Sequence, residues 1–200
     1  MTLDLTQQFN ALYTAPEKEP VFVDVPEQKI ISFTGTGDPY ATADFKKAIE
    51  MLFEVAHRIM FACQKMGNDF SVMPLEGLWW TDGMKPLSAL NKDVWKWELF
   101  IVQPDFVTKE IFDDAVKQTA LTNKHAALNS LEFKTLNEGR SVQILRIGHF
   151  NNEAPTNAAI DDFIDSHGCR LNGKHHEIYL SDARKIAPEK LQTIIRQPVI

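Results

Sequence analysis

The spacing of hydrophobic residues predicts three helices along the chain. Apolar residues at three- and four-residue steps mark a long helix over residues 42–66, which Gly67 should end. A shorter helix is predicted over about 108–120, and a third begins at Pro155 and ends at Gly168. The apolar stripe of the first helix consists of Phe45, Ile49, Phe53, Ala56, Met60 and Cys63.

Short runs rich in β-branched and aromatic residues predict strands between these helices. They are "EQKIISFTGTG" (27–37), "DFSVMPLEGLWW" (69–80), "DVWKWELFIVQP" (93–104) and "KHHEIYLSD" (174–182). "LEFKTL" and "SVQILRIGHF" flank "NEGR" and predict a β-hairpin, while the tail "APEKLQTIIRQPVI" predicts a closing helical turn.

The second half of the chain echoes the first. Residues 33–53 align with residues 144–164, and Gly37 then falls on Gly148. "WELFI" also resembles "HEIYL", which places Glu98 opposite Glu177 and Phe100 opposite Tyr179. The pattern predicts one α+β domain, made of duplicated strand–helix–strand–strand modules with pseudo-twofold symmetry and a ligand cleft between them.

These boundaries divide the chain into a leader and a domain. Residues 1–20 are mostly polar and are expected either to pack on the domain or to hang free. The domain spans residues 21–200, and its modules cover about 28–103 and 131–182.

Composition narrows the classes of partner. The chain has 200 residues, 44% of them hydrophobic and 24% charged, with a formal net charge of -6. No run of Lys and Arg exceeds two residues, so the basic surface typical of nucleic-acid binding is missing. The acidic balance suits cationic or neutral ligands better than phosphates.

The same inventory favours a cytoplasmic protein. Two cysteines in apolar contexts are typical of a reducing compartment, although a secreted protein with one disulfide is the alternative. The N-terminal residues lack the basic start and apolar core of a signal peptide. No stretch of 18 apolar residues predicts a membrane span.

Tryptophan and glutamate crowd into one part of the sequence. All four tryptophans lie between positions 79 and 97, and Glu76 lies in the apolar run "VMPLEGLWW". Because side chains alternate along a strand, Glu98 shares a face with Phe100, and Glu177 shares a face with Tyr179. If the repeat holds, both pairs face one cleft.

A carboxylate in apolar surroundings has two chemical uses. Its pKa is expected to rise, which suits a general base that activates water. It can also neutralise an organic cation that stacks on aromatic rings. The alternative is that the glutamates reach solvent and the tryptophans only pack. Trp79 and Trp80 point to opposite faces, so one of them at most should line the cleft.

Other catalytic motifs are missing from the sequence. His175 and His176 are adjacent in a strand and diverge, which argues against a metal pair. "FTGTGDP" lacks the lysine of a phosphate-binding loop, and no G-x-S-x-G motif occurs. Cys63 lies in mid-helix on the apolar stripe. No metal and no cofactor are therefore expected.

Three segments together resemble the GyrI-like small-molecule-binding family, in particular its stand-alone members of about 200 residues. They are "VMPLEGLWW", "WKWELFIVQP" and "HHEIYLSDARKIAPEKLQTIIRQPV". The resemblance implies a duplicated module whose cleft binds bulky, often cationic, aromatic compounds around an acidic residue, here Glu177. The aromatic lining that it implies falls on Trp79, Trp97, Phe100 and Tyr179. With the residue reasoning above, the expected ligand-binding set is Glu76, Trp79, Trp80, Trp97, Glu98 and Phe100.

The resemblance also leaves the function divided between classes. Binding of an aromatic or cationic small molecule, such as a drug or xenobiotic, is the first expectation. Some stand-alone relatives hydrolyse the cyclopropane ring of DNA-alkylating natural products, so the resemblance permits a cofactor-free hydrolase here. In such a mechanism Glu177 would be the base that deprotonates water, and Tyr179 would be the donor to the leaving system. A protein-binding adaptor is the third reading. Only about 20 residues precede the domain, so no DNA binding is expected; the chain should be a monomer or weak dimer.

Overall fold

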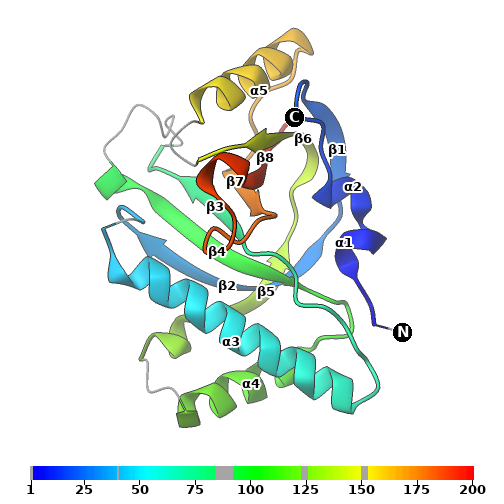
Figure 1. Ribbon diagram of the computed structural model, residues 1–200, viewed down its shortest axis with the longest axis vertical. Helices are drawn as coiled ribbons and strands as arrows, with labels where there is room; N and C mark the ends of the chain where they lie inside the picture. The colour runs from blue at the N-terminus through cyan, green and yellow to red at the C-terminus, as the bar shows by residue number, and fades with distance from the viewer. Residues whose placement is uncertain (1, 40, 84–91, 123–125, 150–152) are drawn as a thin grey trace.

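The computed structural model describes residues 2–39, 41–83, 92–122, 126–149 and 153–200. Its centre is an antiparallel sheet that curls into a half-barrel, with strand order β1-β6-β8-β7-β3-β4-β2-β5 (Figure 1). The strands are β1 (Val21–Val25), β2 (Gln28–Thr36), β3 (Glu76–Trp80), β4 (Lys96–Gln103), β5 (Glu132–Leu136), β6 (Gly139–Ile147), β7 (His175–Tyr179) and β8 (Gln192–Pro198).

The predicted helices are present with nearly the predicted bounds. They are α3 (Ala43–Lys65), α4 (Lys109–Thr122) and α5 (Ala154–Ser166). Two short helices, α1 (Leu5–Gln8) and α2 (Asn10–Tyr13), come before the sheet, and the 3-10 turns are η2 (Lys92–Val94), η3 (Ala126–Ser130) and η4 (Pro188–Lys190). In the described part of the chain, no helix has the length and apolar character needed to cross a membrane.

The predicted hairpin between β5 and β6 is wrong. β5 pairs with β2 at one end of the strand order, whereas β6 pairs with β1 and β8 near the other end. The chain continues from β5 into β6 through a bend at Gly139, where φ is 65°. Val25 pairs with Gly139 and Gln28 pairs with Leu136, so two bent strands run antiparallel side by side. This shared ribbon makes the sheet curl.

The predicted helical turn at the tail is also wrong in its main part. Only Pro188–Lys190 is helical, and the following residues form β8 between β6 and β7. The run Thr193, Ile194, Ile195 is β-branched and buried on both sides of the strand, as expected of an interior strand. Helical periodicity over so few residues gave no reliable signal.

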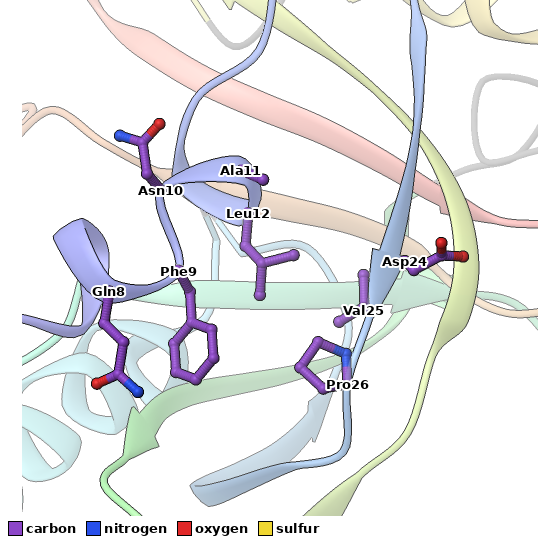
Figure 2. Close-up of a pocket in the computed structure, with 8 residues that line it drawn as sticks. All are labelled: Gln8, Phe9, Asn10, Ala11, Leu12, Asp24, Val25 and Pro26. Carbon is purple, nitrogen blue, oxygen red and sulfur yellow. The ribbon is translucent and has the colours of Figure 1, made fainter.

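One face of the sheet, the N-terminal face, is covered by the first residues of the chain. Leu5, Leu12 and Tyr13 are buried in the main core. Arg196 and Gln143 donate hydrogen bonds to backbone carbonyls between residues 11 and 14. A groove of about 470 Å³ lies beside α2 and the end of β1 (Figure 2), and its lining residues are Gln8, Phe9, Asn10, Ala11, Leu12, Asp24, Val25 and Pro26.

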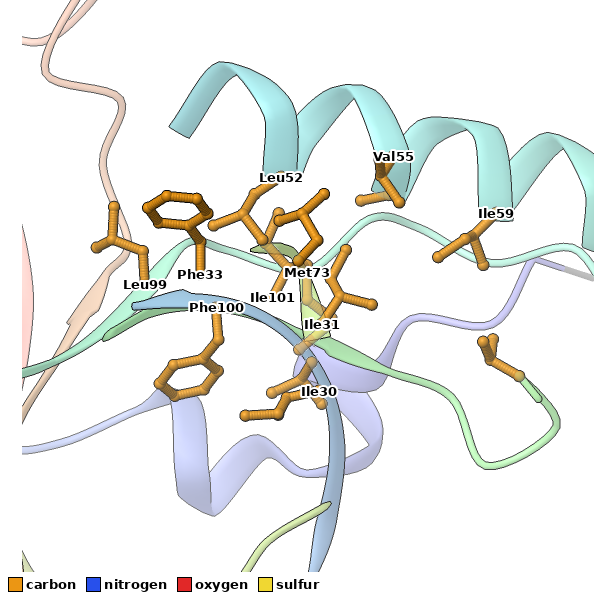
Figure 3. Close-up of a cluster of buried hydrophobic side chains, with 14 of the residues drawn as sticks. Ile30, Ile31, Phe33, Leu52, Val55, Ile59, Met73, Leu99, Phe100 and Ile101 are labelled. Atoms are coloured by element: carbon orange, nitrogen blue, oxygen red, sulfur yellow. The ribbon is translucent and has the colours of Figure 1, made fainter. Parts of the chain in front are cut away.

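The other face, the helix face, carries α3 and α5. Leu52, Val55 and Ile59 of α3 lie over the sheet, and Phe100 points away from that helix (Figure 3). A smaller core joins α5 to the far end of the sheet and contains Val142, Ile144, Ile160, Ile164, Ile195 and Val199. The two faces are therefore distinct environments, and each strand residue belongs to one of them.

Candidate functional site

The middle of the sheet brings β3 and β7 together. Gly77 pairs with Glu177, and Trp79 pairs with His175. Directly paired residues of neighbouring strands share a face, so Trp79, Glu177 and Tyr179 all lie on the helix face. Glu177 is 6% exposed, which makes it a carboxylate buried near the centre of the sheet.

Gly77 creates the space in which Trp79 and Tyr179 approach each other. A Cβ at this position would lie 3.1 Å from Nε1 of Trp79 and 3.3 Å from the hydroxyl oxygen of Tyr179. The Tyr179 hydroxyl also hydrogen-bonds to Glu177. A glycine within an apolar strand is the signal that could have predicted this close approach.

Aromatic rings extend from this point along α3 and β4. Phe45 of α3 lies 5.8 Å from Trp79 and 5.0 Å from Trp97 between ring centroids, and Trp95 lies 5.9 Å from Trp79. Trp97 is fully buried because Gly35 leaves room for its ring; a Cβ on Gly35 would lie 2.2 Å from that ring. Phe33 stacks on Trp97 at a centroid distance of 6.1 Å, so aromatic neighbours already surround this buried ring.

Charged residues surround Glu177 on the same face. His175 Nε2 lies 3.6 Å from Glu177 Oε1, and Arg146 Nη1 lies 2.9 Å from Glu153 Oε1. Arg146 comes from β6, and Glu153 immediately precedes α5. The cluster thus collects groups from β6, β7 and the start of α5.

The two carboxyl groups of this cluster have pKa values displaced in opposite directions. The rise in pKa expected for Glu177 from the sequence is wrong. Burial would raise its pKa, but the close approach of His175, with Arg146 and Tyr179, holds it below its ordinary value. Burial and the charge of Glu177 raise the pKa of Glu153 in spite of Arg146. Burial, followed by Glu177, raises the pKa of Tyr179 well above its ordinary value.

The cluster also meets a distance criterion for cation binding. Glu153, His175 and Glu177 each offer one ligand atom, and these atoms lie within 4.8 Å of one another. The guanidinium of Arg146 already places a positive charge against Glu153. A cationic side chain there opposes a metal ion, and we assign none.

Glu98 and Phe100 do not join this cluster, so the predicted pairing of Glu98 with Glu177 in one cleft is wrong. Leu78 pairs with both Glu98 and His176, which places Glu98 on the N-terminal face. There Glu98 contacts Lys134 and lies 3.6 Å from Lys174. The short motif "WELFI" matched "HEIYL" by composition, but the two strands lie on either side of β3 with registers that point these acids apart.

Glu76 and Trp80 lie on the N-terminal face as well. The hydroxyl of Tyr13 donates to Glu76 at 3.0 Å, and His176 Nε2 lies 3.0 Å from the other carboxylate oxygen. Lys174 Nζ lies 3.6 Å from the centroid of the Trp80 ring. These predicted residues therefore face away from Glu177.

Sequence reasoning missed Arg146, Glu153 and His175 as members of the site. Arg146 occupies an inward position in the otherwise apolar "ILRI", which was a usable signal of a buried charge. Glu153 gave no local signal, because its position depends on how the chain enters α5. The groove of Figure 2 and a second cavity beside α4 are lined by other residues, none of them Glu177 or a tryptophan.

A family model decides the relationship of the chain to known proteins. The model of the GyrI-like small molecule binding domain matches residues 18–200. The chain belongs to this GyrI-like family. An uncharacterized conserved protein from Listeria innocua is 34% identical over 100% of both chains, with a TM-score of 0.90.

This GyrI-like protein is also similar to other solved structures. A hydrolase encoded by lin2189 from Listeria innocua is 34% identical over 100% of both chains, with a TM-score of 0.87. The EcmrR C-terminal domain is 14% identical over 91% of this chain and 97% of its own, with a TM-score of 0.59, so it shares the fold. Among curated proteins, none matches the chain.

Proposed function

We propose that this GyrI-like protein binds bulky aromatic small molecules, cations included, on the helix face around Glu177. The observation that carries the proposal is the buried Glu177 carboxylate beside Tyr179 and Trp79 at the sheet centre. A planar ligand stacks on the partly exposed ring of Trp95 beside the buried Trp79, and Glu177 balances its charge. Each cation–π contact adds about 0.5–2 kcal/mol. Drugs and other xenobiotics have this chemistry, and their detoxification is the role we propose.

The duplication proposed from the sequence accounts for the central place of Glu177. β2, α3, β3 and β4 recur in order as β6, α5, β7 and β8. β2 starts at residue 28 and α3 at residue 43, while β6 starts at residue 139 and α5 at residue 154. The strand and the helix therefore have the same spacing in both halves. The strand order β6-β8-β7-β3-β4-β2 reads as two mirrored halves, and Gly77 and Glu177 pair at their junction. The sequence placed the second module at about 131–182, whereas β8, the last element of this order, ends at Pro198. Superposing residues 28–103 on 139–198 therefore tests the pseudo-twofold; different connectivity would sink it.

A second candidate function is hydrolysis of a cyclopropane-type electrophile. Full-length relatives from Listeria innocua that are 34% and 33% identical are described as hydrolases, and this observation favours it. Glu177, ionised and buried, takes a proton from a water molecule that attacks the ring carbon. Tyr179 orients Glu177 through their hydrogen bond. A ligand held by stacking then presents its ring to that water.

Tryptophan quenching and product formation separate these candidates. The protein is titrated with a planar aromatic cation, its neutral isostere and a cyclopropane-bearing electrophile. Quenching without product supports binding alone, and product supports the hydrolase. If the protein shows no quenching and forms no product, the third class remains, an adaptor for a protein partner.

A matched pair of variants tests Glu177 itself. Glu177→Gln should weaken cation binding about ten- to a hundredfold, or about 1–3 kcal/mol, because a partly desolvated charge loses its partner. Glu98→Gln should leave that affinity unchanged, since Glu98 lies on the opposite face. Equal effects of the two variants would contradict the placement of the site.

A further inference from the structure

We propose that Glu153 is a second catalytic residue, which donates a proton to the leaving oxygen of a neutral electrophile while Glu177 takes one from water. This role rests on the hydrolysis proposed above. It adds a general acid to the base proposed there.

The geometry provides two carboxyl groups in one place. Glu153 and Glu177 each contribute an oxygen to the cluster within 4.8 Å, so both groups can reach one bound molecule. The Glu153 side chain is 28% exposed and that of Glu177 is 8% exposed. Glu153 is thus the more accessible of the two carboxyl groups.

The neighbours of the pair favour one shared proton. Two carboxylates this close repel each other when both are ionised, so one of them keeps its proton at a higher pH than usual. The charged and titratable groups around Glu153 are Arg146 of β6 and His175, Glu177 and Tyr179 of β7. His175 Nε2 lies 3.6 Å from Glu177, and Tyr179 hydrogen-bonds to it. Both neighbours stabilise the Glu177 carboxylate, which leaves the proton on Glu153.

Displacement of the two pKa values is the general pattern of an acid and a base in one site. The pKa of Glu153 is raised, chiefly by burial and then by Glu177, and that of Glu177 is lowered against its own burial by His175 and Arg146. Arg146 Nη1 holds Glu153 Oε1 at 2.9 Å, which fixes one oxygen and leaves the other to carry the proton toward the ligand.

The step balances as follows for a cyclopropane joined to a conjugated carbonyl. The water oxygen forms a bond to a ring carbon and gives one proton to Glu177. The ring C–C bond breaks, and its electron pair moves through the conjugated system to the carbonyl oxygen. Glu153 protonates that oxygen, and the product contains the substrate plus one water. The proton on Glu177 then passes to the Glu153 carboxylate, which restores both groups.

Two probes that differ in the acidity of the released hydroxyl test the role of Glu153. They are a spirocyclopropyl cyclohexadienone fused to a planar aromatic system, and its nitro-substituted analogue, which releases a more acidic phenol. Glu153→Gln should lower kcat on the first probe about 10²–10⁴-fold, the usual contribution of a positioned acid. On the nitro analogue the loss should be below about tenfold, because that leaving oxygen needs no proton.

Controls separate catalysis from binding and folding. Asp162→Asn removes an exposed carboxylate of α5, the helix that Glu153 precedes, and should leave both rates unchanged. Dissociation constants from tryptophan quenching should agree within a few fold for wild type and Glu153→Gln. The wild type supplies a test without any variant: its rate on the first probe should fall at high pH as Glu153 loses its proton, and its rate on the nitro analogue should not.

The outcomes distinguish the two proposals. Wild-type turnover with equal losses on both probes in Glu153→Gln, or with no loss on either, overturns the role of Glu153 and leaves the hydrolysis standing. A wild type that binds the probes without turnover overturns the hydrolysis and the acid together. A selective loss on the first probe supports both.

Discussion

His176 Nε2 lies 3.0 Å from Glu76 Oε2, directly across the β7–β3 pair from the candidate site. His176 Nδ1 lies 2.9 Å from Glu138 Oε2, and Arg196 Nη1 lies 3.6 Å from the same oxygen. All four side chains are almost completely buried. Two anions and two cations therefore balance inside the N-terminal face.

Unfolding of the protein should depend on pH through this network. Burial would lower the pKa of His176, but Glu138 and then Glu76 raise it. The stabilisation from His176 is thus complete below its unfolded pKa of about 6.5 and is lost as pH rises through the higher folded pKa. Burial would raise the pKa of Glu138, but His176 and Arg196 lower it, so its contribution is present above about 4.5 and lost in acid.

His176→Asn should consequently destabilise the protein most between pH 4.5 and 6.5, where both contributions are present. Breaking a buried ion pair costs about 3–5 kcal/mol. Urea unfolding at several pH values measures the loss of unfolding free energy, and the variant His57→Asn, at an exposed histidine, is the control. A constant difference between wild type and His176→Asn from pH 5 to 9 would contradict the charged state of His176.

Tyr13→Phe should destabilise the protein by about 1–3 kcal/mol, because Glu76 Oε1 loses the donor that it has in the buried interior. Amide hydrogen exchange should also rise in α1 and α2, since Tyr13 anchors them to the sheet. Thr14→Val, which removes an exposed hydroxyl next to it, is the matched control. Equal stability of both variants would mean that water replaces the tyrosine donor.

Gly35→Ala should cost about 1–3 kcal/mol through overpacking, because the new Cβ falls 2.2 Å from the Trp97 ring. Urea unfolding measures the loss. Combining Gly35→Ala with Trp97→Leu should cost less than the two single changes added together, since the smaller side chain removes the clash. Additive costs would show that Trp97 does not lie over Gly35.

Gly77→Ala should affect ligand binding more than folding. The contacts of its Cβ would be 3.1–3.3 Å, which the flexible ends of Trp79, Leu99 and Tyr179 can relieve by small shifts. Those shifts separate the two groups that the proposed ligand contacts. We expect about tenfold weaker binding of the planar aromatic cation in a quenching titration, at a stability change near 1 kcal/mol. Unchanged affinity would remove Gly77 from the site.

Local pattern determined much of the fold. The apolar stripe of 42–66 predicted α3, Pro155 predicted the start of α5, and Gly67 with φ of 86° ends its helix as expected. Alternation along β7 also placed Glu177 and Tyr179 on one face, because the two-residue period of a strand is a local property. The tryptophan cluster followed from sequence proximity, since β3 and β4 are neighbours in the sheet.

Only the tertiary structure decided which acids meet. Glu98 and Glu177 face opposite ways because strand register and partner choice depend on distant segments, and a one-residue shift of register exchanges the faces of a strand. The curl of the sheet turned an expected hairpin into a bent ribbon and made β8 an interior strand. Arg146 and Glu153 reach Glu177 through the same long-range packing, so no local pattern could place them beside it.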